Sequence, residues 1–578
     1  MSNWKIIGDR LITRWANKVD PNNPLPAHPK PQLKRDEWFN LNGLWDYAIV
    51  PKNHSDVSEF DGKILVPFPV ESPISGVKKT LRPKDRLWYR RYFSIPSSWS
   101  GRKVLLHFGA VDFRATVYLN NIKLGIHEGG YTPFTFEISQ YLQDINELKI
   151  SVWDPTGKGC QERGKQLLRN FLIYYTAVSG IWQTVWLEPV NNIYIENLKL
   201  KTDIENEILE VHIKIAGNIS NIRSRIIIKD PNNKIINSNI FHIEDKIQLD
   251  VPDTILWSPE NPYLYNLEIE LLKDDIIVDK IESYFGMREI SIKKDSNEIT
   301  RIYLNNKSIF QYGVLDQGYW PDGLYTAPTE DALKYDIEIA KELGFNMIRK
   351  HVKIEPALWY YHCDKLGMLV WQDMPNGGRY LFIIGKKRNK KCKKIYYKTL
   401  KSMINLLYNS PSIVVWVPFN EGWGQFETAQ VTDFIRNYDS NRLIDSASGW
   451  KDRKVGDIKD IHAYPGPKIP KLEDKRVAVL GEFGGLGLKI DDHVWKNKKF
   501  KWSYKKSKDS KTMETKYTNL VSDLKPLKKI GLSAAVYTQI TDVEGEINGL
   551  ITYDREVIKI DKEKIRKLHL DLIKTKTE

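Results

Sequence analysis

Residues 329–349 read TEDALKYDIEIAKELGFNMIR, a helix pattern followed at once by a strand pattern. Thr329 belongs to the residue types that cap helix N-termini. Four apolar residues then recur at the spacing of one helix face: Leu333, Ile337, Ala340 and Leu343. Gly344 is suited to end the helix, and residues 345–349 predict a buried strand. The stretch therefore predicts one repeat of a fold in which helices and strands alternate.

The same alternation continues towards the C-terminus. Eight short apolar runs, each expected to form a buried strand, occupy residues 309–315, 345–349, 368–371, 412–417, 443–446, 461–463, 478–480 and 533–537. Helix patterns separate several of these runs, for example at residues 398–408 and 427–437. Buried strands with helical connections over residues 288–578 predict a C-terminal (β/α)8 TIM barrel.

Before residue 288 the pattern is one of short strands punctuated by Gly and Pro. Asn120 and Asn121 separate two such strands and predict a hairpin turn, because Asn tolerates positive φ. The first run of strands predicts an N-terminal β jelly roll, and the second predicts a smaller immunoglobulin-like β-sandwich. A chain of 578 residues exceeds a single core, and the expected domains are residues 1–190, 191–287 and 288–578.

The formal charge of +14 could suit a polyanionic partner, and the densest basic cluster is residues 386–394. That cluster lacks the interleaved aromatic residues on which single-stranded nucleic acid stacks. A solvated loop is the preferred interpretation of the cluster, and a charge-driven nucleic-acid binder is the last-ranked function. No nucleic-acid partner is therefore expected.

Three cysteines, Cys160, Cys363 and Cys392, are too few and too scattered for a disulfide framework or a cysteine-based zinc site. The first ten residues lack the apolar run of a signal peptide, and no apolar stretch approaches the length of a membrane span. These features predict a reduced, cytoplasmic chain with no membrane partner, and secretion is the alternative if the start of the sequence is truncated. They give no indication of an oligomeric state.

In a (β/α)8 barrel the active site forms at the carboxyl ends of the strands. Glu421 follows the fourth expected strand, and Glu482 follows the seventh. Two carboxyl groups on facing strands fit retaining glycoside hydrolysis, in which they lie about 5–5.5 Å apart. A single glutamate at either position would be equally consistent with a rim charge paired with Arg349 or with a lysine.

Several motifs in order resemble those of glycoside hydrolase family 2, the β-galactosidases, β-glucuronidases and β-mannosidases. The motifs lie at residues 39–45, 88–91, 108–125 and 180–183 in the jelly roll, at 257–265 and 285–288 in the second domain, and at Asn420, Glu421 and Glu482 in the barrel. The resemblance covers nearly the whole chain. It implies hydrolysis of a terminal β-linked sugar with net retention, and therefore a carbohydrate substrate.

The resemblance also implies roles for five residues. Glu421 matches the acid/base of the family, and Glu482 matches its nucleophile. Asn420 matches the residue that contacts the sugar 2-hydroxyl. Arg349 matches an arginine near the nucleophile, and Tyr464 matches a tyrosine that hydrogen-bonds it. A nucleophile beside Arg349 and Tyr464 would stay ionised, as its role requires.

Five further residues at strand ends are candidates for substrate binding. His351 and His462 could orient sugar hydroxyls, or each could be a hydrogen-bonded barrel histidine. Asp373 could bind sugar or brace Arg349. Trp423 could form a sugar platform or pack the rim. Tyr537 stands on the eighth strand, where many relatives have Trp.

Departures from the family pattern bear on the metal and on the sugar. Residues 374–378 read MPNGG where large β-galactosidases carry a magnesium-binding Glu-x-His, so neither a metal nor another cofactor is expected. The uronate-reading Asn-x-Lys motif of β-glucuronidases has its only counterpart at residues 497–499, after the seventh strand instead of the eighth. A β-galactoside is therefore slightly favoured. The alternative is a non-catalytic carbohydrate-binding protein on a decayed scaffold, because the basic loop borders the site.

Overall fold

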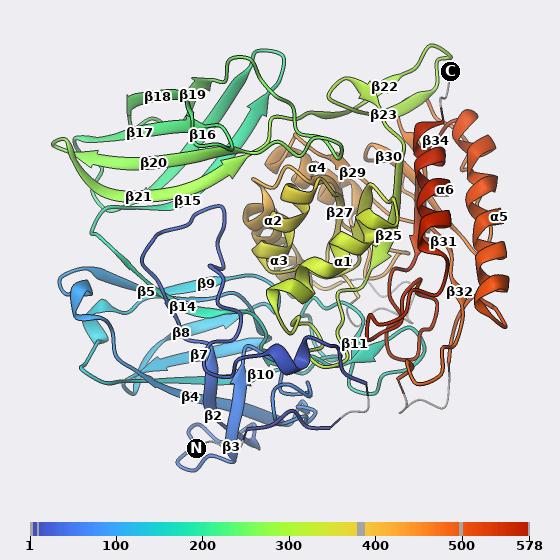
Figure 1. Ribbon diagram of the computed structural model, residues 1–578. Coiled ribbons are helices and arrows are strands. Elements are labelled where there is room, and N and C mark those ends of the chain that lie inside the picture. The colour runs from blue at the N-terminus through green and yellow to red at the C-terminus, as the bar shows by residue number, and fades with distance from the viewer. Residues whose placement is uncertain (1–3, 9–10, 378–387, 496–500, 576–578) are drawn as a thin grey trace.

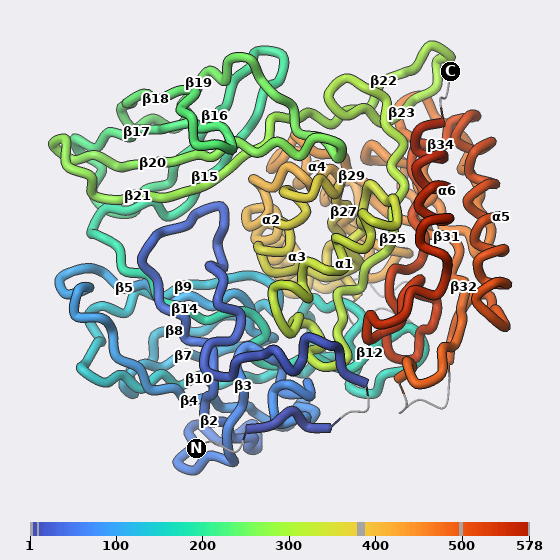
Figure 2. The backbone as a smooth tube through the Cα atoms, viewed as in Figure 1, coloured from blue at the N-terminus to red at the C-terminus, as the bar shows by residue number. Residues whose placement is uncertain are grey.

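The computed structural model describes residues 4–8, 11–377, 388–495 and 501–575. Three bodies are visible along the chain (Figure 1): a blue and cyan β-domain, a green β-sandwich beside it, and a barrel coloured from yellow-green to red. The backbone trace follows them in that order (Figure 2). The three-part architecture expected from the sequence is confirmed.

The N-terminal domain is a jelly roll of two packed sheets. One sheet contains, in spatial order, β1 (Phe39–Asn40), β14 (Val185–Val190), β5 (Lys103–Phe108) and β9 (Phe134–Glu137). The other contains β3 (Gly62–Val66), β2 (Gly43–Pro51), β4 (Asp85–Phe93), β10 (Asn146–Trp153), β7 (Arg114–Leu119) and β8 (Ile122–Glu128). Asn120 and Asn121 both have positive φ in the turn between β7 and β8, which confirms the predicted hairpin.

Two short strand pairs complete this domain. They are β6 (Val111–Asp112) with β13 (Gly180–Ile181), and β11 (Gln166–Leu167) with β12 (Tyr175–Thr176). The second pair belongs to a long excursion of the chain, residues 154–179, that leaves the two sheets. This excursion reaches the barrel.

The second domain is the expected immunoglobulin-like sandwich. Its first sheet contains β15 (Tyr194–Asp203), β16 (Ile208–Ala216) and β19 (Ile247–Asp250). Its second sheet contains β18 (Ile235–His242), β17 (Ile222–Lys229), β20 (Tyr265–Lys273) and β21 (Ile276–Phe285). In β17 every second side chain is buried, which is the period of a strand with one face in the core.

A small sheet of β22 (Ile290–Lys294), β23 (Thr300–Leu304) and β24 (Lys307–Ser308) leads into the barrel. The eight barrel strands are β25 (Gln311–Asp316), β26 (Met347–Lys350), β27 (Leu369–Asp373), β28 (Ile413–Val417), β29 (Leu443–Ile444), β30 (Ile458–Ala463), β31 (Val477–Gly484) and β34 (Leu532–Thr538). Their order in the sheet is 29-28-27-26-25-34-31-30, which is chain order around a barrel. The eight predicted strands are confirmed.

The barrel helices are α1 (Glu330–Glu342), α2 (Ala357–Leu366), α3 (Lys390–Leu407), α4 (Thr428–Tyr438), α5 (Ser510–Lys529) and α6 (Lys562–Lys574). A further pair, β32 (Leu486–Gly487) and β33 (Lys505–Lys506), lies between β31 and α5. The alternation with helices is incomplete, because residues 445–457 and 464–476 connect their strands without a helix. The second connection contains three prolines, which interrupt helices.

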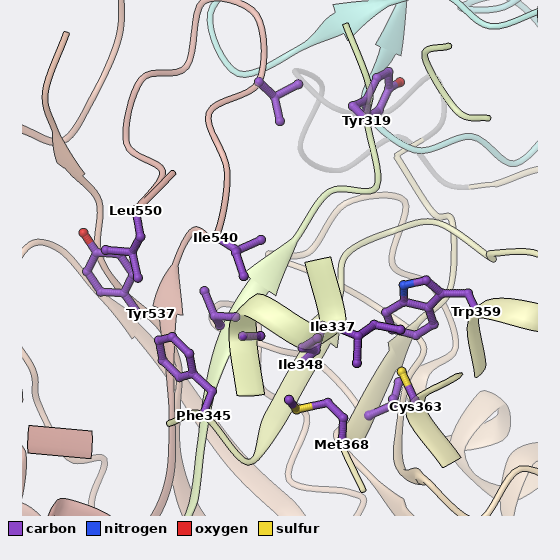
Figure 3. Packing of buried hydrophobic residues seen from close by; sticks show 14 of the residues in the cluster. Tyr319, Ile337, Phe345, Ile348, Trp359, Cys363, Met368, Tyr537, Ile540 and Leu550 are labelled. Atoms are coloured by element: carbon purple, nitrogen blue, oxygen red, sulfur yellow. The ribbon is translucent and has the colours of Figure 1, made fainter. Parts of the chain in front are cut away.

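The predicted helix–strand repeat folds as expected. The Thr329 side chain accepts a hydrogen bond from the Ala332 amide at 3.1 Å, and Gly344 has a φ of 88°. Ile337 of α1 and Ile348 of β26 lie in the same buried cluster (Figure 3). Packing of the apolar helix face onto the strand is thus the contact that the sequence pattern specifies.

The N-terminal segment joins the jelly roll to the other two domains. Trp15 is buried in the barrel cluster, and its ring lies 5.9 Å from that of Trp320. Thr13 donates through its backbone amide to Asp322 at 2.8 Å. Arg35 forms an ion pair with Asp279 of β21 at 2.9 Å.

A disulfide joins the jelly-roll excursion to the barrel. Cys160 and Cys392 are bonded, with their Cα atoms 4.8 Å apart. The expectation of a fully reduced chain is therefore wrong, and the cysteine count no longer supports a reducing compartment. Separation by 232 residues hides such a pairing from the sequence. None of the described helices is long and apolar enough to span a membrane.

The basic cluster differs from the expected solvated loop. Residues 386 and 387 lie outside the described part of the chain, whereas residues 390–394 form the first turn of α3. Arg388 is buried and forms an ion pair with Glu162 of the jelly-roll excursion. The cluster is thus partly a helix and partly an interdomain contact.

Candidate active site

One of the two candidate catalytic glutamates follows β28 and the other lies within β31, on facing sides of the barrel. Glu482 lies within β31 and has a side chain that is 7% exposed. Glu421 lies four residues beyond β28, and its side chain is 17% exposed. Its backbone amide donates to the Ser448 carbonyl at 2.8 Å, and its φ is 50°. A left-handed backbone at a residue other than glycine is strained, and such strain gathers at functional sites.

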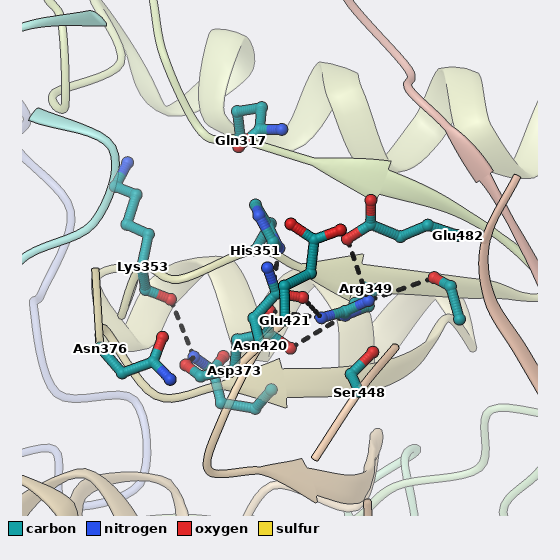
Figure 4. A network of polar contacts seen from close by, with 12 residues as sticks. Gln317, Arg349, His351, Lys353, Asp373, Asn376, Asn420, Glu421, Ser448 and Glu482 are labelled. Carbon is teal, nitrogen blue, oxygen red and sulfur yellow. Dashed lines mark hydrogen bonds and ion pairs between the residues drawn. The ribbon is translucent and has the colours of Figure 1, made fainter. Parts of the chain in front are cut away.

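The carboxyl groups of Glu421 and Glu482 converge on one point, together with the imidazole of His462. One oxygen of each glutamate and one nitrogen of the histidine all lie within 4.8 Å of one another. Figure 4 shows the two carboxylates turned towards each other. Such a close approach of two carboxylate oxygens fits the short spacing of retaining glycosidases better than the wide spacing of inverting ones.

Arg349 of β26 donates hydrogen bonds to three other site residues. It forms a bidentate pair with Asp373 at 3.0 Å for both bonds. It also donates to Glu482 Oε1 at 3.3 Å and to Asn420 Oδ1 at 2.8 Å. The guanidinium is fully buried and permanently charged, so it fixes the carboxylates of Asp373 and Glu482 in position.

Glu482 is held ionised by its neighbours. Burial alone would raise its pKa, but His462, Arg349, His351 and the Tyr464 hydroxyl outweigh burial and lower the pKa to about 2. Tyr464 donates a short hydrogen bond to Glu482 Oε2, and its hydroxyl lies 2.9 Å from Thr538 Oγ1. A carboxylate that is ionised at neutral pH is available as a nucleophile.

His462 contacts the other glutamate. Its Nδ1 lies 3.0 Å from Glu421 Oε1, and its Nε2 lies 2.8 Å from Ser448 Oγ. Ser448 in turn donates to Asp460. Burial opposes the charged imidazole, but Glu482, Glu421 and Asp460 raise the pKa of His462 above its ordinary value.

The remaining candidates from strands 2 to 4 lie in the same group. Asp373 accepts from Arg349 and also lies 2.9 Å from Nδ1 of His351, so it braces both. The ring of Trp423 lies 6.1 Å from that of His351. The Asn420 side-chain nitrogen is buried and has no hydrogen-bond partner within the described residues. An unpaired buried donor beside the carboxylates points to a ligand oxygen.

Tyr537 is the one candidate that lies apart from this group. It is fully buried in the apolar cluster of Figure 3, where its ring packs 4.8 Å from that of Tyr517. Its hydroxyl accepts a hydrogen bond from the Leu486 amide at 3.2 Å. Side chains alternate along a strand, and it is Thr538 that faces Tyr464.

Several residues near the site do not lie at the ends of barrel strands, so the positions of the strands in the sequence do not predict them. Tyr504 stacks on Tyr464 with ring centroids 3.4 Å apart. The ring centroid of Tyr174, in the jelly-roll domain, lies 6.2 Å from that of Trp423. Lys165 and Glu546 form an ion pair nearby. These residues come from loops and from another domain, so only the folded chain brings them together.

Glu421, His462 and Glu482 are also residue types that bind metal ions. The Arg349 guanidinium lies 3.3 Å from Glu482 and already supplies a positive charge at this point. A cation bound by the three residues would face that charge, so the donor set fits a metal ion poorly.

Two curated relatives illustrate the range of similar proteins. A β-galactosidase of Thermoanaerobacter pseudethanolicus is 28% identical over 447 residues, which is 73% of this chain and 57% of the relative. A putative β-glucuronidase of Formosa agariphila is 28% identical over 366 residues, or 61% of this chain and 42% of the relative. The chain thus spans about half the length of these relatives.

Solved structures share the whole architecture at low identity. A β-glucuronidase from Ruminococcus gnavus superposes with a TM-score of 0.75 at 17% identity, over 94% of this chain and 100% of that one. A β-D-glucuronidase from Dictyoglomus thermophilum superposes with a TM-score of 0.74 at 19% identity, over 95% of this chain and 99% of that one. At such identities the likeness concerns the fold.

Family models match all three domains in succession. The sugar-binding domain of glycosyl hydrolases family 2 matches residues 30–187, the model named for the family itself matches residues 193–288, and the family's TIM barrel domain matches residues 296–499. With this order of domains, the chain belongs to glycosyl hydrolase family 2.

Proposed function

We propose that the protein is a retaining exo-β-glycosidase that removes a terminal β-linked sugar by double displacement. The observation that carries the proposal is the approach of Glu421 and Glu482 to within 4.8 Å across the barrel mouth. Such a close approach fits one anomeric carbon between the two groups, as in retaining enzymes, better than the wider gap that inverting enzymes keep for a water molecule.

In the first step Glu482 attacks the anomeric carbon, and the glycosidic bond breaks. Glu421 donates its proton to the departing oxygen, so the aglycone leaves as a neutral alcohol. In the second step Glu421 removes a proton from water, and the water oxygen displaces Glu482. Two inversions give net retention and regenerate both glutamates.

The assignment of the two roles rests on their surroundings. Glu482 accepts from Arg349 and Tyr464, which stabilise its charge. Glu421 instead faces the imidazole of His462, with which it can share a proton. The free side-chain nitrogen of Asn420 is placed to donate to a sugar hydroxyl next to the anomeric carbon.

Action on a chain end is supported by the jelly-roll excursion. The backbone carbonyl of Arg163, in this excursion, accepts a hydrogen bond of 2.8 Å from the amide of Gly377, which lies beyond the end of β27. Tyr174 of the same excursion reaches Trp423. A domain laid over one side of the barrel mouth blocks the passage of a long polysaccharide and favours its terminal residue.

The preferred sugar is a β-galactoside. Relatives named β-galactosidase and β-glucuronidase match the chain similarly well. The loop after β34 carries Glu546 and Asn548, and the resemblance to β-glucuronidases would require an Asn-x-Lys motif there. The two-step chemistry uses protein carboxyl groups alone, and it requires neither a cofactor nor a nucleic-acid partner.

Release of 4-nitrophenol from a panel of aryl β-glycosides tests the proposal. The β-galactoside is expected to react fastest, and Glu482→Gln is expected to reduce turnover by at least about 10⁴-fold because no covalent intermediate can form. Glu137→Gln, on the jelly-roll surface, is the control. Normal turnover in Glu482→Gln, or release of the α-anomer as the first product, would refute the assignment.

A further inference from the structure

A buried ion pair joins the jelly roll to the last barrel loop beside the active site. Lys165 Nζ lies 3.7 Å from Glu546 Oε2, and the two side chains are 6% and 2% exposed. Lys165 belongs to the jelly-roll excursion, and Glu546 follows β34. The pair therefore brings opposite charges from two domains to one place.

The position of Lys165 is fixed over the ends of the second and third barrel strands. The Gly377 amide, beyond β27, donates to the Arg163 carbonyl at 2.8 Å. A Cβ on Gly164 would lie 2.6 Å from the Val352 carbonyl, so the excursion touches the chain just after His351. Lys165 is the next residue and starts from this contact.

Glu546 is held on the side of β34 and β25 by a chain of amides. Asn548 donates to Glu546 Oε1 at 3.1 Å, and Gln539 donates to Asn548 at 2.9 Å. Gln317, just beyond β25, donates to Gln539 at 2.8 Å. Figure 4 places Gln317 on the side of the site opposite Asp373 and Ser448, with the two catalytic carboxylates between them. The pair thus borders the barrel mouth on the side of its first, second and eighth strands.

The charges of the pair act on residues of the catalytic group. Burial lowers the pKa of His351, and Lys165 lowers it further. Burial raises the pKa of Tyr504, and Glu482, Glu546 and Glu421 all raise it further. The charges of both catalytic carboxylates and of Glu546 thus act on the same tyrosine.

Lys165 has unused hydrogen-bonding capacity. An ammonium can donate three hydrogen bonds. Within the described residues Lys165 makes one, to the Tyr175 hydroxyl at the limiting distance of 3.5 Å. Glu546 Oε2, at 3.7 Å, is beyond hydrogen-bond reach and already accepts from Tyr175 at 2.5 Å. A buried cation with free donors beside a substrate site is suited to acceptor oxygens of the substrate.

We infer that Lys165 and Glu546 are specificity-determining residues that select a neutral terminal sugar over a uronic acid. Lys165 donates to hydroxyl oxygens on the ring carbons remote from the anomeric carbon, and Glu546 accepts from a hydroxyl there. A sugar carboxylate would meet the negative charge of Glu546 and would have no proton to offer it. The inference rests on the proposed glycosidase function.

The test compares kcat/KM for 4-nitrophenyl β-D-galactoside and 4-nitrophenyl β-D-glucuronide in the full chain. Glu546→Gln is expected to lower the galactoside-to-glucuronide ratio by about 10- to 100-fold, the range of one charge-assisted hydrogen bond. Lys165→Met is expected to lower kcat/KM for the galactoside by a similar factor. Lys165→Arg should restore part of this loss, which a purely structural role for the lysine would not predict.

Glu137→Gln is the matched control, because Glu137 pairs with Lys103 on the exposed surface of the jelly roll. It should leave the ratio unchanged. An unchanged ratio in folded Glu546→Gln, or a wild-type preference for the glucuronide, overturns the inference. If Glu546→Gln does not fold, an undiminished kcat/KM in Lys165→Met overturns it instead. No release from any aryl β-glycoside by the wild type would refute the proposed function itself.

Discussion

His462 lies against Glu421, with its Nδ1 3.0 Å from Glu421 Oε1. On the other side of the ring, Nε2 lies 2.8 Å from the Ser448 hydroxyl, which donates its own proton to Asp460. Ser448 therefore accepts from Nε2–H, and in the neutral imidazole Nδ1 is left as an acceptor. Glu421 and His462 can thus share one proton, which the proposed acid step requires.

Replacing His462 with Asn should move the alkaline limb of the pH profile. In the wild type the imidazole of His462 holds the shared proton up to its own raised pKa, and the variant lacks this imidazole. Activity is lost as this proton leaves, so the limb is expected at lower pH. At neutral pH kcat/KM should fall by about 10²-fold, which is the lower end of general acid contributions. The measurement is kcat/KM between pH 4 and 9.

A substrate whose leaving group needs no proton is the control for that experiment. With a dinitrophenyl glycoside the His462→Asn variant should keep most of its activity, because the acid step no longer limits the rate. An alkaline limb at the wild-type position, or an equal loss with both substrates, would show that His462 does not hold the proton.

Replacing Glu421 with Ala should separate substrates by their leaving groups. For poor leaving groups the loss is expected to be about 10²- to 10⁴-fold, since no group donates the proton. For a dinitrophenyl glycoside the first step should remain fast, and the glycosyl-enzyme should accumulate because no base activates water. Rapid-quench kinetics would show this as a burst of phenol followed by a slow phase. A uniform loss without a burst would argue against the acid/base role.

Strand ends could be predicted because short apolar runs mark them locally. The apolar runs that precede Glu421 and Glu482 are uninterrupted, so the position of each glutamate after its run is enough to predict it as a site residue. The sequence alone does not predict whether a given side chain at a strand end points into the site or into the surrounding core. The position of Tyr537 at the end of the eighth strand predicts a side chain that faces the site, but the pleat turns it to the core and turns Thr538 to Tyr464.

Contacts between domains could not be predicted from the sequence. Lys165 and Glu546 are separated by 381 positions, and no periodic pattern couples residues across such a distance. The Cys160–Cys392 disulfide is hidden for the same reason. The resemblance to a family supplies the order of domains, but loop contacts particular to this chain come only from its own coordinates.

Replacing Arg349 with Gln should create an acid limb that the wild type lacks. Glu482 has a lowered pKa of about 2, so in the wild type its ionised form is lost only as the pH falls through about 2. Removal of the guanidinium raises this pKa, because burial then acts against fewer positive charges. Loss of kcat/KM between pH 6 and 4 is expected in the variant but not in the wild type.

The same substitution has a stability consequence with a defined sign. A carboxyl group with a lowered folded-state pKa stabilises the fold above its unfolded-state pKa, and this stability is lost as the pH falls through the folded value. In Arg349→Gln the loss for Glu482 should begin at higher pH, and Asp373 loses its bidentate partner as well. Thermal unfolding at pH 7 and pH 5 measures this. A variant that shows no acid limb between pH 6 and 4, and whose melting temperature depends on pH as in the wild type, would contradict the role of Arg349.

Replacing Arg388 with Met should loosen the jelly-roll excursion from the barrel. Glu162 is buried and faces Arg388, and burial raises the pKa of Glu162 while Arg388 opposes that rise. An unpaired buried carboxylate costs about 3–5 kcal/mol, so the melting temperature should fall. KM for the aryl glycoside should rise, because Lys165 and Tyr174 follow Glu162 in the same segment. The double variant Glu162→Gln/Arg388→Met removes the charge and should recover most of the melting temperature. If the single and double variants melt alike, the buried pair is not what holds the excursion in place.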